Sequence, residues 1–414
     1  MTKEQIIIKS RENLLEKRII LFGVGEVAQK FYQKNRNRLK ISHCVSNMKE
    51  QWGKQAFLNE LDVVEFKSEN IGPNDYLIVC GPFAFRQIEI QLINCGFRMF
   101  EHFIESSIAE CVLENKKIAL FRGSCILRDI YECVITSKTF TEQYAPIYAT
   151  DNYAVSKFDN RVLYYASKIC DCYIYSYRML RRDKVYLLTD EELPKDCVKI
   201  SVSNITFPGY WPQADPEIRN SNKYLIHPYN SKRDLIFHHT MYRLEDTNIN
   251  RFMDEGKEFE EIYSLISSKD FYDEKAVKRN LKIAFKSVQI AEQFADIKAM
   301  DFIKDNYDKR MLFQNFAHMH KCVIWTYVRR LFEKLQLASE ECDALEEMSP
   351  KYIHHGGDIP IYPSVARALE LTWYDENMKY EIMTYHGVEE MTFEQYVRHY
   401  VEYTKRAKEI MASW

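Results

Sequence analysis

A cysteine stands where a short apolar run of the sequence meets an amphipathic one. Residues 117–132 read KIALFRGSCILRDIYE, and the apolar run stops at Arg122-Gly123-Ser124-Cys125. The pattern predicts a strand that ends at Gly123 and a helix that begins two residues later. The thiol would then share its space with the first backbone N–H groups of the helix, which stabilise a thiolate or a developing oxyanion. Cysteine is also among the most often buried residue types, and the spacing alone favours that interpretation.

Several histidines could act as a base for this thiol. His318 and His320, in NFAHMHKCVIW, lie just before or at the start of a strong helical pattern. The other candidates are His227 before a proline, His238-His239 after an apolar run and His354-His355 before two glycines. A single histidine is more often a structural hydrogen-bonding group than a catalyst, so the residues alone do not single out one of them.

A glycine turn near the N-terminus is a weak candidate for a nucleotide site. The apolar run 18–22 is followed by Gly23, Gly25 and Ala28 in G-x-G-x-x-A spacing. In the first βα unit of a nucleotide-binding sheet this spacing lets a pyrophosphate approach a helix N-terminus. Ser46-Asn47 stand where such proteins usually carry the acid that holds the ribose. Tight packing of the helix on the strand would explain the glycines equally well.

Two other segments could contribute to binding. The turn Pro208-Gly209-Tyr210-Trp211-Pro212 is rigid and aromatic, and it could wall a pocket or close the edge of a core. A basic cluster could hold phosphates, because guanidinium groups match phosphate oxygens, although most basic runs are solvated surface. The cluster consists of Arg178, Arg181, Arg182 and Lys184.

Short apolar runs alternate with helical patterns over the first half of the chain. We expect strands at 18–22, 41–45, 63–66, 76–80, 118–121, 172–177, 185–188 and 198–207, and helices at 86–94, after Asp273, at 320–335 and at 393–411. This alternation predicts an α/β fold with parallel sheets. The first domain, residues 1–113, is expected to be Rossmann-like, and the second, residues 114–414, to become helical in its C-terminal part.

The composition excludes several classes of protein. The net charge of −3, from 57 basic and 60 acidic residues, offers no basic face for nucleic acid. No apolar stretch approaches the roughly 20 residues that span a bilayer. The 11 cysteines have no paired spacing, and the start MTKEQIIIKSREN has no apolar signal segment, so a cytoplasmic protein is expected. Cys170 and Cys172 form C-x-C without a second pair at zinc spacing, so no metal is expected.

From Ile118 to about Tyr374 the sequence resembles the WcbI-like polysaccharide biosynthesis family of acetyltransferases. Four segments carry the resemblance in the family's order. They are RGSC at 122–125, like its G-N-C; ITFPGYWPQ at 205–213, like its F-x-G-Y-H-P; RMLFQNFAHMHKCVIWTYV at 310–328, like the segment around its N-H-P; and DIPIYPSVARALELTW at 358–373, like its P-I-x-P-x-V. The departures are Ser124 for Asn, Ile126 for Gln, Trp211 for His, and Ala317-His318-Met319 for N-H-P.

This resemblance implies a fold related to the SGNH hydrolases, binding of coenzyme A, and acyl transfer to a sugar. Cys125 stands at the offset of the SGNH nucleophile, and His318 is the implied base that it should face across a pocket. Ser124 would donate to the oxyanion, Tyr210 and Trp211 would wall the pocket, and Gly123, Arg128, Arg181 and Arg182 would help to bind the substrates. A further SGNH-like group with G-S-C-x-x-R-D suggests that Arg128 and Asp129 orient the turn.

The leading hypothesis is therefore a cytoplasmic enzyme that moves an acyl group from coenzyme A, for example acetyl-CoA, to a precursor of a capsular or other surface polysaccharide. One alternative is an SGNH-like esterase that removes acyl groups. Another is a non-catalytic protein that binds a glycan or a nucleotide. The first domain resembles the Rossmann-type modules attached to bacterial sugar-modifying enzymes, and the sequence leaves open whether it binds a nucleotide and whether the protein is a homo-oligomer.

Overall fold

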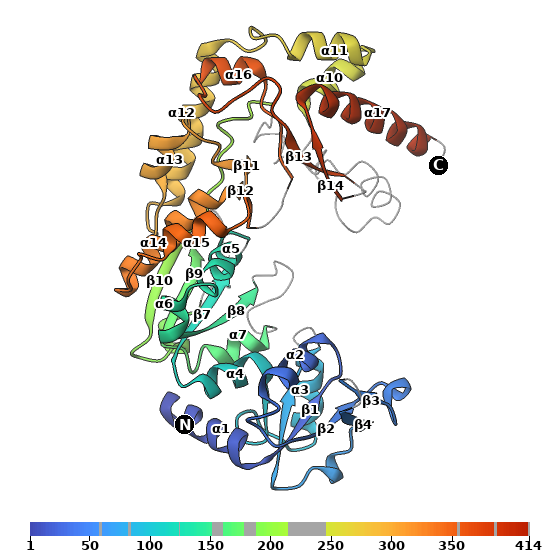
Figure 1. The fold of residues 1–414 in the computed structure, drawn as a ribbon, viewed down its shortest axis with the longest axis vertical. Coiled ribbons are helices and arrows are strands. Elements are labelled where there is room, and N and C mark those ends of the chain that lie inside the picture. The colour runs from blue at the N-terminus through green and yellow to red at the C-terminus, as the bar shows by residue number, and fades with distance from the viewer. Residues whose placement is uncertain are drawn as a thin grey trace. The chain divides into compact units, whose positions relative to one another are not determined.

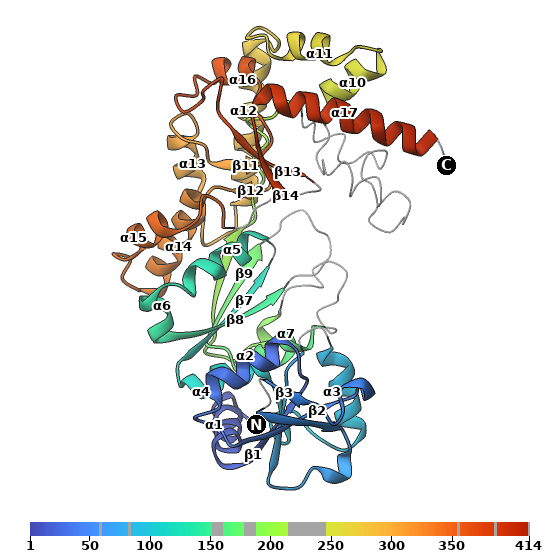
Figure 2. The same cartoon turned by 45° about the vertical axis from the view of Figure 1, so that its right-hand side comes forward.

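The computed structural model describes residues 1–57, 60–81, 84–123, 125–150, 160–177, 188–213, 246–353, 357–384 and 387–412 (Figures 1 and 2). The chain divides into two compact units. Unit 1 comprises Met1–Ser176, Leu180–Val202 and Leu337–Ser339, and unit 2 comprises Tyr177–Met179, Ser203–Gln336 and Glu340–Trp414.

Unit 1 opens with a largely parallel sheet in the order β3-β4-β2-β1-β5-β6. Its central strand β1, RIILF, is buried after its first residue because helices cover a parallel sheet on both faces. Only β3 is antiparallel to its neighbour. The elements are α1 (Lys3–Glu16), β1 (Arg18–Phe22), α2 (Glu26–Asn35), β2 (Ile41–Ser46), β3 (Gln55–Ala56), β4 (Leu61–Glu65), β5 (Asp75–Val79), α3 (Phe85–Asn94), β6 (Phe103–Glu105) and α4 (Ser106–Glu114).

A second sheet follows in the order β10-β9-β7-β8, with β7 parallel to both β8 and β9. Its elements are β7 (Lys117–Gly123), α5 (Cys125–Val134), α6 (Lys138–Gln143), β8 (Tyr144–Thr150), α7 (Arg161–Ala166), β9 (Cys172–Tyr177) and β10 (Val198–Ser203). The chain leaves β7 toward β8 on one side and leaves β9 toward β10 on the other. The carboxyl ends of β7 and β9 therefore form a topological switch point, the usual place for a ligand in an open α/β sheet.

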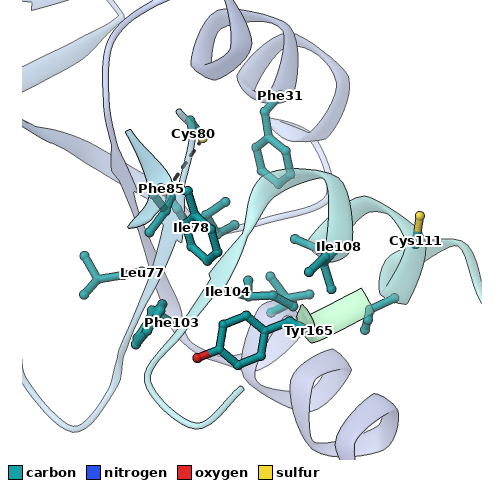
Figure 3. Close-up of a cluster of buried hydrophobic side chains, with 14 of the residues drawn as sticks. Phe31, Leu77, Ile78, Cys80, Phe85, Phe103, Ile104, Ile108, Cys111 and Tyr165 are labelled. Carbon is teal, nitrogen blue, oxygen red and sulfur yellow. Dashed lines mark hydrogen bonds between the residues drawn. The ribbon is translucent and has the colours of Figure 1, made fainter. Parts of the chain in front are cut away.

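The two sheets of unit 1 share one hydrophobic core. Residues of the second sheet and of α7 belong to the same cluster of buried side chains as the first sheet, among them Ile118, Leu120 and Tyr165. Figure 3 shows Tyr165 in this cluster with Phe85 of α3 and Phe103 of β6, and the ring centroids of Tyr165 and Phe85 are 6.3 Å apart. The expected domain boundary after residue 113 falls in the last turn of α4, inside this unit.

A buried ion pair also joins the helices of the two sheets. Glu89 on α3 accepts hydrogen bonds from Nε and Nη2 of Arg161 on α7 at 2.6 and 2.7 Å. The Tyr165 hydroxyl donates to the same carboxylate. Only 2% of the Glu89 side chain is exposed, so its charge is balanced almost wholly by these partners.

Unit 2 is largely helical. Its helices are α10 (Thr247–Asp254), α11 (Phe259–Ile266), α12 (Glu274–Ala291), α13 (Met300–Asn306), α14 (Lys321–Leu335), α15 (Cys342–Met348), α16 (Pro363–Ala368) and α17 (Phe393–Ala412). Its hairpins pair β11 (Phe313–Asn315) with β12 (His318–Met319), and β13 (Tyr380–Thr384) with β14 (Gly387–Met391). Asp273 caps α12 as expected, since its carboxylate accepts from two first-turn N–H groups.

The predicted α/β class with parallel sheets is confirmed. The strand expected at 198–207 is shorter, because β10 ends at Ser203, and the strand expected at 185–188 lies mostly outside the described residues. Described residues from 246 onward add two hairpins that the sequence analysis did not expect. No helix in the described part of the chain is long and apolar enough to cross a membrane.

The Glu89–Arg161 pair gives a first prediction. Arg161→Met leaves the buried Glu89 carboxylate without its guanidinium, so the free energy of unfolding should fall by about 3–5 kcal/mol in chemical denaturation. Lys30→Met is the control, because Lys30 pairs with Glu26 on the exposed surface of α2 and should cost less than about 0.5 kcal/mol. Equal losses in the two variants would contradict the structural role of the buried pair.

Candidate functional site

The turn from β7 into α5 is shaped by the missing side chain of Gly123. A Cβ at this residue would lie 2.4 Å from Ser176 Oγ, at the end of β9, and 2.9 Å from Leu127 Cβ on α5. Only glycine lets the helix and the neighbouring strand approach this closely. The Gly123 carbonyl accepts a hydrogen bond from the Tyr148 hydroxyl of β8 at 2.9 Å. The switch point is therefore closely packed on both sides of β7.

Cys125 is the first residue of α5, and its side chain is exposed. Of the 11 cysteines only Cys95 is also exposed, and it lies at the C-terminal end of α3. A helix N-terminus presents N–H groups and favours an anion, whereas a C-terminus disfavours one. Cys125 is thus the exposed thiol that lies at a helix N-terminus, beside N–H groups that can stabilise an oxyanion.

The two residues one turn further along α5 have opposite environments. Arg128 is exposed and lies 3.9 Å from Glu132. Asp129 is 3% exposed, and its Oδ1 has no hydrogen-bond partner among the described residues. Burial raises the pKa of Asp129 to about 7. The sequence analysis placed both residues at the turn but did not foresee that the carboxyl group is buried.

Arg122 is a candidate that the sequence analysis missed. It is the penultimate residue of β7, it is buried, and its Nη1 has no hydrogen-bond partner among the described residues. A buried guanidinium is costly unless an anion balances its charge. The R-G-S-C pattern contains the arginine, but its burial depends on tertiary packing.

Several predicted site residues lie outside the described residues. These are Ser124, the oxyanion donor, and the whole basic cluster with Arg181 and Arg182. The histidines at 227, 238, 239, 354 and 355 lie there as well. Among the described residues, no group of three or more His, Cys, Asp or Glu side chains is arranged to hold a metal ion.

Three of the four motif segments come together in unit 2. Phe207 N donates to Phe316 O at 2.8 Å, which joins segment 205–213 to segment 310–328. Ile359 N donates to Gln314 O at 2.8 Å, which joins segment 358–373 to the same hairpin. The rings of Phe207 and Phe313 are stacked with centroids 4.9 Å apart. Segments far apart in sequence thus build one local structure around β11 and β12.

Tyr210 and Trp211, expected as pocket walls, are core residues of this structure. Both are fully buried. The Tyr210 hydroxyl donates to Tyr307 O and the Trp211 Nε1 donates to Ile359 O, each at 2.8 Å. Their polar atoms therefore satisfy backbone carbonyls, and neither ring is exposed. Gly209 is required between them and Phe207, because a Cβ there would lie 2.7 Å from the Phe207 ring.

His318 begins β12, is half-buried, and is held by Asn315 of β11. Asn315 Oδ1 accepts from Ala317 N, from His318 N and from His318 Nδ1, each at 3.0 Å, while its Nδ2 donates to Gly357 O at 3.0 Å. Since the amide oxygen can only accept, the proton of a neutral imidazole must lie on Nδ1 and the lone pair on Nε2. This is the tautomer that a general base acting through Nε2 requires.

His320 has a different role. It is the N-cap of α14, where its ring Nδ1 accepts from Cys322 N. Burial and then the charge of Lys351 lower the pKa of His320 to about 4, so it stays neutral at physiological pH and can accept this bond. The helix predicted at 320–335 therefore begins after His320, which is its N-cap.

The glycine turn of the first sheet has a packing role. Gly23 has φ +121°, and a Cβ there would lie 3.0 Å from Cys80 O at the end of β5. Gly25 is the N-cap of α2, and Ala28 is buried against the core. At the usual place of the ribose-binding acid, Asn47 forms two hydrogen bonds with Gln91 of α3, at 2.7 and 3.2 Å. Nucleotide binding at this turn stays a prediction.

The strand order of the second sheet and the exposed Cys125 after β7 define the class of this protein. It is a doubly wound α/β protein with a cysteine at the switch point. Residues 176–340 match the family model described as the polysaccharide biosynthesis enzyme WcbI. The resemblance to this family is thus confirmed for residues 176–340. The matched residues include Tyr210, Trp211 and His318 but not Cys125.

A solved structure similar to this chain is described as native WcbI, a novel polysaccharide biosynthesis enzyme, without a disulfide bond between CoA and one of its cysteines. The two chains have a TM-score of 0.50 and 14% sequence identity, and the match covers 72% of this chain and 93% of the other. At this identity the likeness shows the fold alone. A comparison with curated proteins gives no match.

The burial of Asp129 predicts a dependence of stability on pH. A pKa raised from 3.8 to about 7 means that the folded protein favours the protonated carboxyl group, so this stabilisation is complete below about pH 4 and is lost as the pH rises through 7. Asp129→Asn removes this loss, and at about pH 8 it should raise the free energy of unfolding by up to about 4 kcal/mol. Denaturation at pH 4 is the control, where wild type and variant should agree closely.

The packing at Gly123 predicts a specific rescue. Gly123→Ala should cost about 1–3 kcal/mol of unfolding free energy, because the new methyl group meets Ser176 and Leu127. Ser176→Gly in the same chain should restore part of that loss, since it removes the closest contact. Gly25→Ala, where a Cβ meets no atom within 4 Å, should cost less than about 1 kcal/mol. Failure of Ser176→Gly to restore any stability would contradict the proposed clash.

Proposed function

We propose that this protein transfers an acyl group from a coenzyme A thioester to a hydroxyl group of a polysaccharide precursor. The observation that carries the proposal is the exposed Cys125 at the N-terminus of α5, at the switch point of the second sheet. The WcbI family match supports polysaccharide biosynthesis as the setting. The description of the similar structure mentions CoA and a cysteine of that protein, which supports coenzyme A as the acyl carrier here.

In the proposed reaction, the Cys125 thiolate attacks the thioester carbonyl. The N–H groups of the first turn of α5 stabilise the oxyanion that forms, and the thiolate of coenzyme A leaves. The acyl group is then bonded to Cys125. A sugar hydroxyl attacks this new thioester, its proton passes to a base, and the Cys125 thiolate is released. Ser124 would add its hydroxyl to the oxyanion donors.

We assign His318 the role of that base, because the contact with Asn315 places the proton of the neutral ring on Nδ1 and leaves the basic lone pair on Nε2. Asn315 is a positioning residue that the sequence analysis did not single out. Direct transfer, in which the sugar attacks the coenzyme A thioester without an acyl-cysteine, would use the same base. Arg122 is the buried cation in this part of the chain that could balance an anionic group of the donor.

The acyl-cysteine step is tested by mass spectrometry of the protein incubated with acetyl-CoA and no acceptor. We expect one acetyl group on Cys125, none in Cys125→Ala, and an unchanged yield in the control Cys95→Ala. Transfer to glycan should fall by at least about 100-fold in Cys125→Ala. Acetate released at the same rate with and without a glycan acceptor would contradict transfer and indicate hydrolysis.

The Asn315–His318 contact is tested by the pH profile of kcat/KM. In Asn315→Asp a carboxylate accepts the Nδ1 proton and stabilises the imidazolium, so the pKa of the base rises and the acidic limb should move up by about one pH unit. His318→Ala should lower kcat by about 100-fold or more. His320→Gln is the matched control and should leave the profile unmoved. If the acidic limb moved equally in Asn315→Asp and in His320→Gln, the assignment of His318 as the base would be contradicted.

A further inference from the structure

The outer face of α12 carries a row of four cations. Lys275, Arg279, Lys282 and Lys286 are all exposed. They are spaced by four, three and four residues, so at about 100° per residue they lie within about 60° of one another around the helix. The buried residues of α12 lie on the opposite side; they are Val277, Leu281, Ala284 and Val288. The row is thus directed away from the core of unit 2.

No partner within the described part of the chain neutralises this row. None of the four cations forms an ion pair there, whereas Lys278, on the flank of the row, pairs with Glu274 at 2.6 Å. The neighbouring acid Glu370 also acts on Lys278. Like charges one helical turn apart repel each other. In a protein of net charge −3, such a local excess of positive charge fits an anionic partner.

A row of exposed apolar side chains runs beside the cations. Ile283, Ile290 and Phe294 are 53%, 38% and 60% exposed. Ile283 and Ile290 are one heptad apart on α12, and Phe294 follows the end of the helix. Ile283 and Ile290 fall on one flank of the cationic row, displaced by about 50–70° from its centre around the axis. Cations next to exposed Ile and Phe are the composition of helices that lie in a membrane interface.

We propose that this face of α12 binds the surface of a membrane that contains anionic phospholipids. The cations contact the headgroup phosphates, and the apolar row enters the boundary between headgroups and acyl chains. A soluble polyanion would account for the cations but leave the apolar row without a role. The opposite face of α12 is anchored against α13 and α16, so the surface is already formed before it meets the membrane (Figure 2).

The test is sedimentation of the full chain with vesicles of phosphatidylcholine, with and without phosphatidylglycerol. We expect binding only to the anionic vesicles and weaker binding in high salt. The variant Lys275→Gln/Arg279→Gln/Lys282→Gln/Lys286→Gln should lose about 100-fold or more in partitioning. A matched variant in unit 1, Lys30→Gln/Lys40→Gln/Lys49→Gln/Lys54→Gln, removes four exposed lysines and should keep its binding. Circular dichroism melting verifies that each variant is folded.

The apolar row is tested separately. Ile283→Asn/Ile290→Asn should weaken the binding that survives high salt, while Ile90→Asn/Ile93→Asn on α3, where both side chains are equally exposed, should not. The proposal is overturned if wild type does not bind anionic vesicles, or if the quadruple variant of α12 binds as well as wild type. It is also overturned if heparin binds tightly, independently of Ile283 and Ile290, and vesicles do not compete. Acyl transfer in solution is independent of each of these results.

Discussion

The position of Cys125 depends on the absence of a side chain at Gly123. Ser176 and Leu127 occupy the space that a Cβ would need, so α5 begins directly over the end of β7. The Tyr148 hydroxyl fixes the carbonyl of the same glycine. Because the end of β7, the neighbouring strand β9 and α5 are in mutual contact, Cys125 at the first helical residue is held in one position. A reactive group held by packing in this way loses little entropy when it reacts.

In unit 2 the orientation of His318 depends on a short hairpin. A hairpin of this size is not rigid by itself. The Asn315 side chain stabilises the hairpin, because it binds backbone groups of Ala317, His318 and Gly357 and also the His318 imidazole. The WcbI-like pattern has an asparagine directly before its histidine, and this chain has alanine there. The amide comes instead from three residues before His318, which keeps a polar partner for the ring although the motif has changed.

Much of the fold was predictable because parallel sheets leave a strong signal in the sequence. The runs Arg18–Phe22 and Cys172–Tyr177 are strands with the expected bounds, and the apolar runs read as buried strands because both faces of each sheet are covered. The WcbI resemblance rested on short segments in the right order, and it is confirmed for residues 176–340. The contacts between the segments could not be predicted, since order along the chain does not say which backbone groups meet.

The candidate site was less predictable, for physical reasons that differ from residue to residue. The burial of Asp129 and Arg122 depends on what packs over them, which periodicity does not record. Trp211 was expected to wall a pocket because it lies in a rigid aromatic turn that resembles a family motif, yet its indole N–H satisfies a carbonyl 148 residues away in sequence. His320 and His318 have similar sequence contexts, and only their hydrogen bonds distinguish a helix cap from a candidate base.

The common core of the two sheets in unit 1 has a consequence for how this protein can evolve. Ile118, Leu120 and Tyr165 belong to the same buried cluster as the first sheet, and Arg161 forms an ion pair with Glu89 on α3, which packs on that sheet. A lineage that lost or exchanged the first sheet would need new side chains to cover all of them. The sheet with the glycine turn and the sheet with Cys125 are therefore expected to be inherited as one piece, even in descendants in which the glycine turn has no ligand to bind.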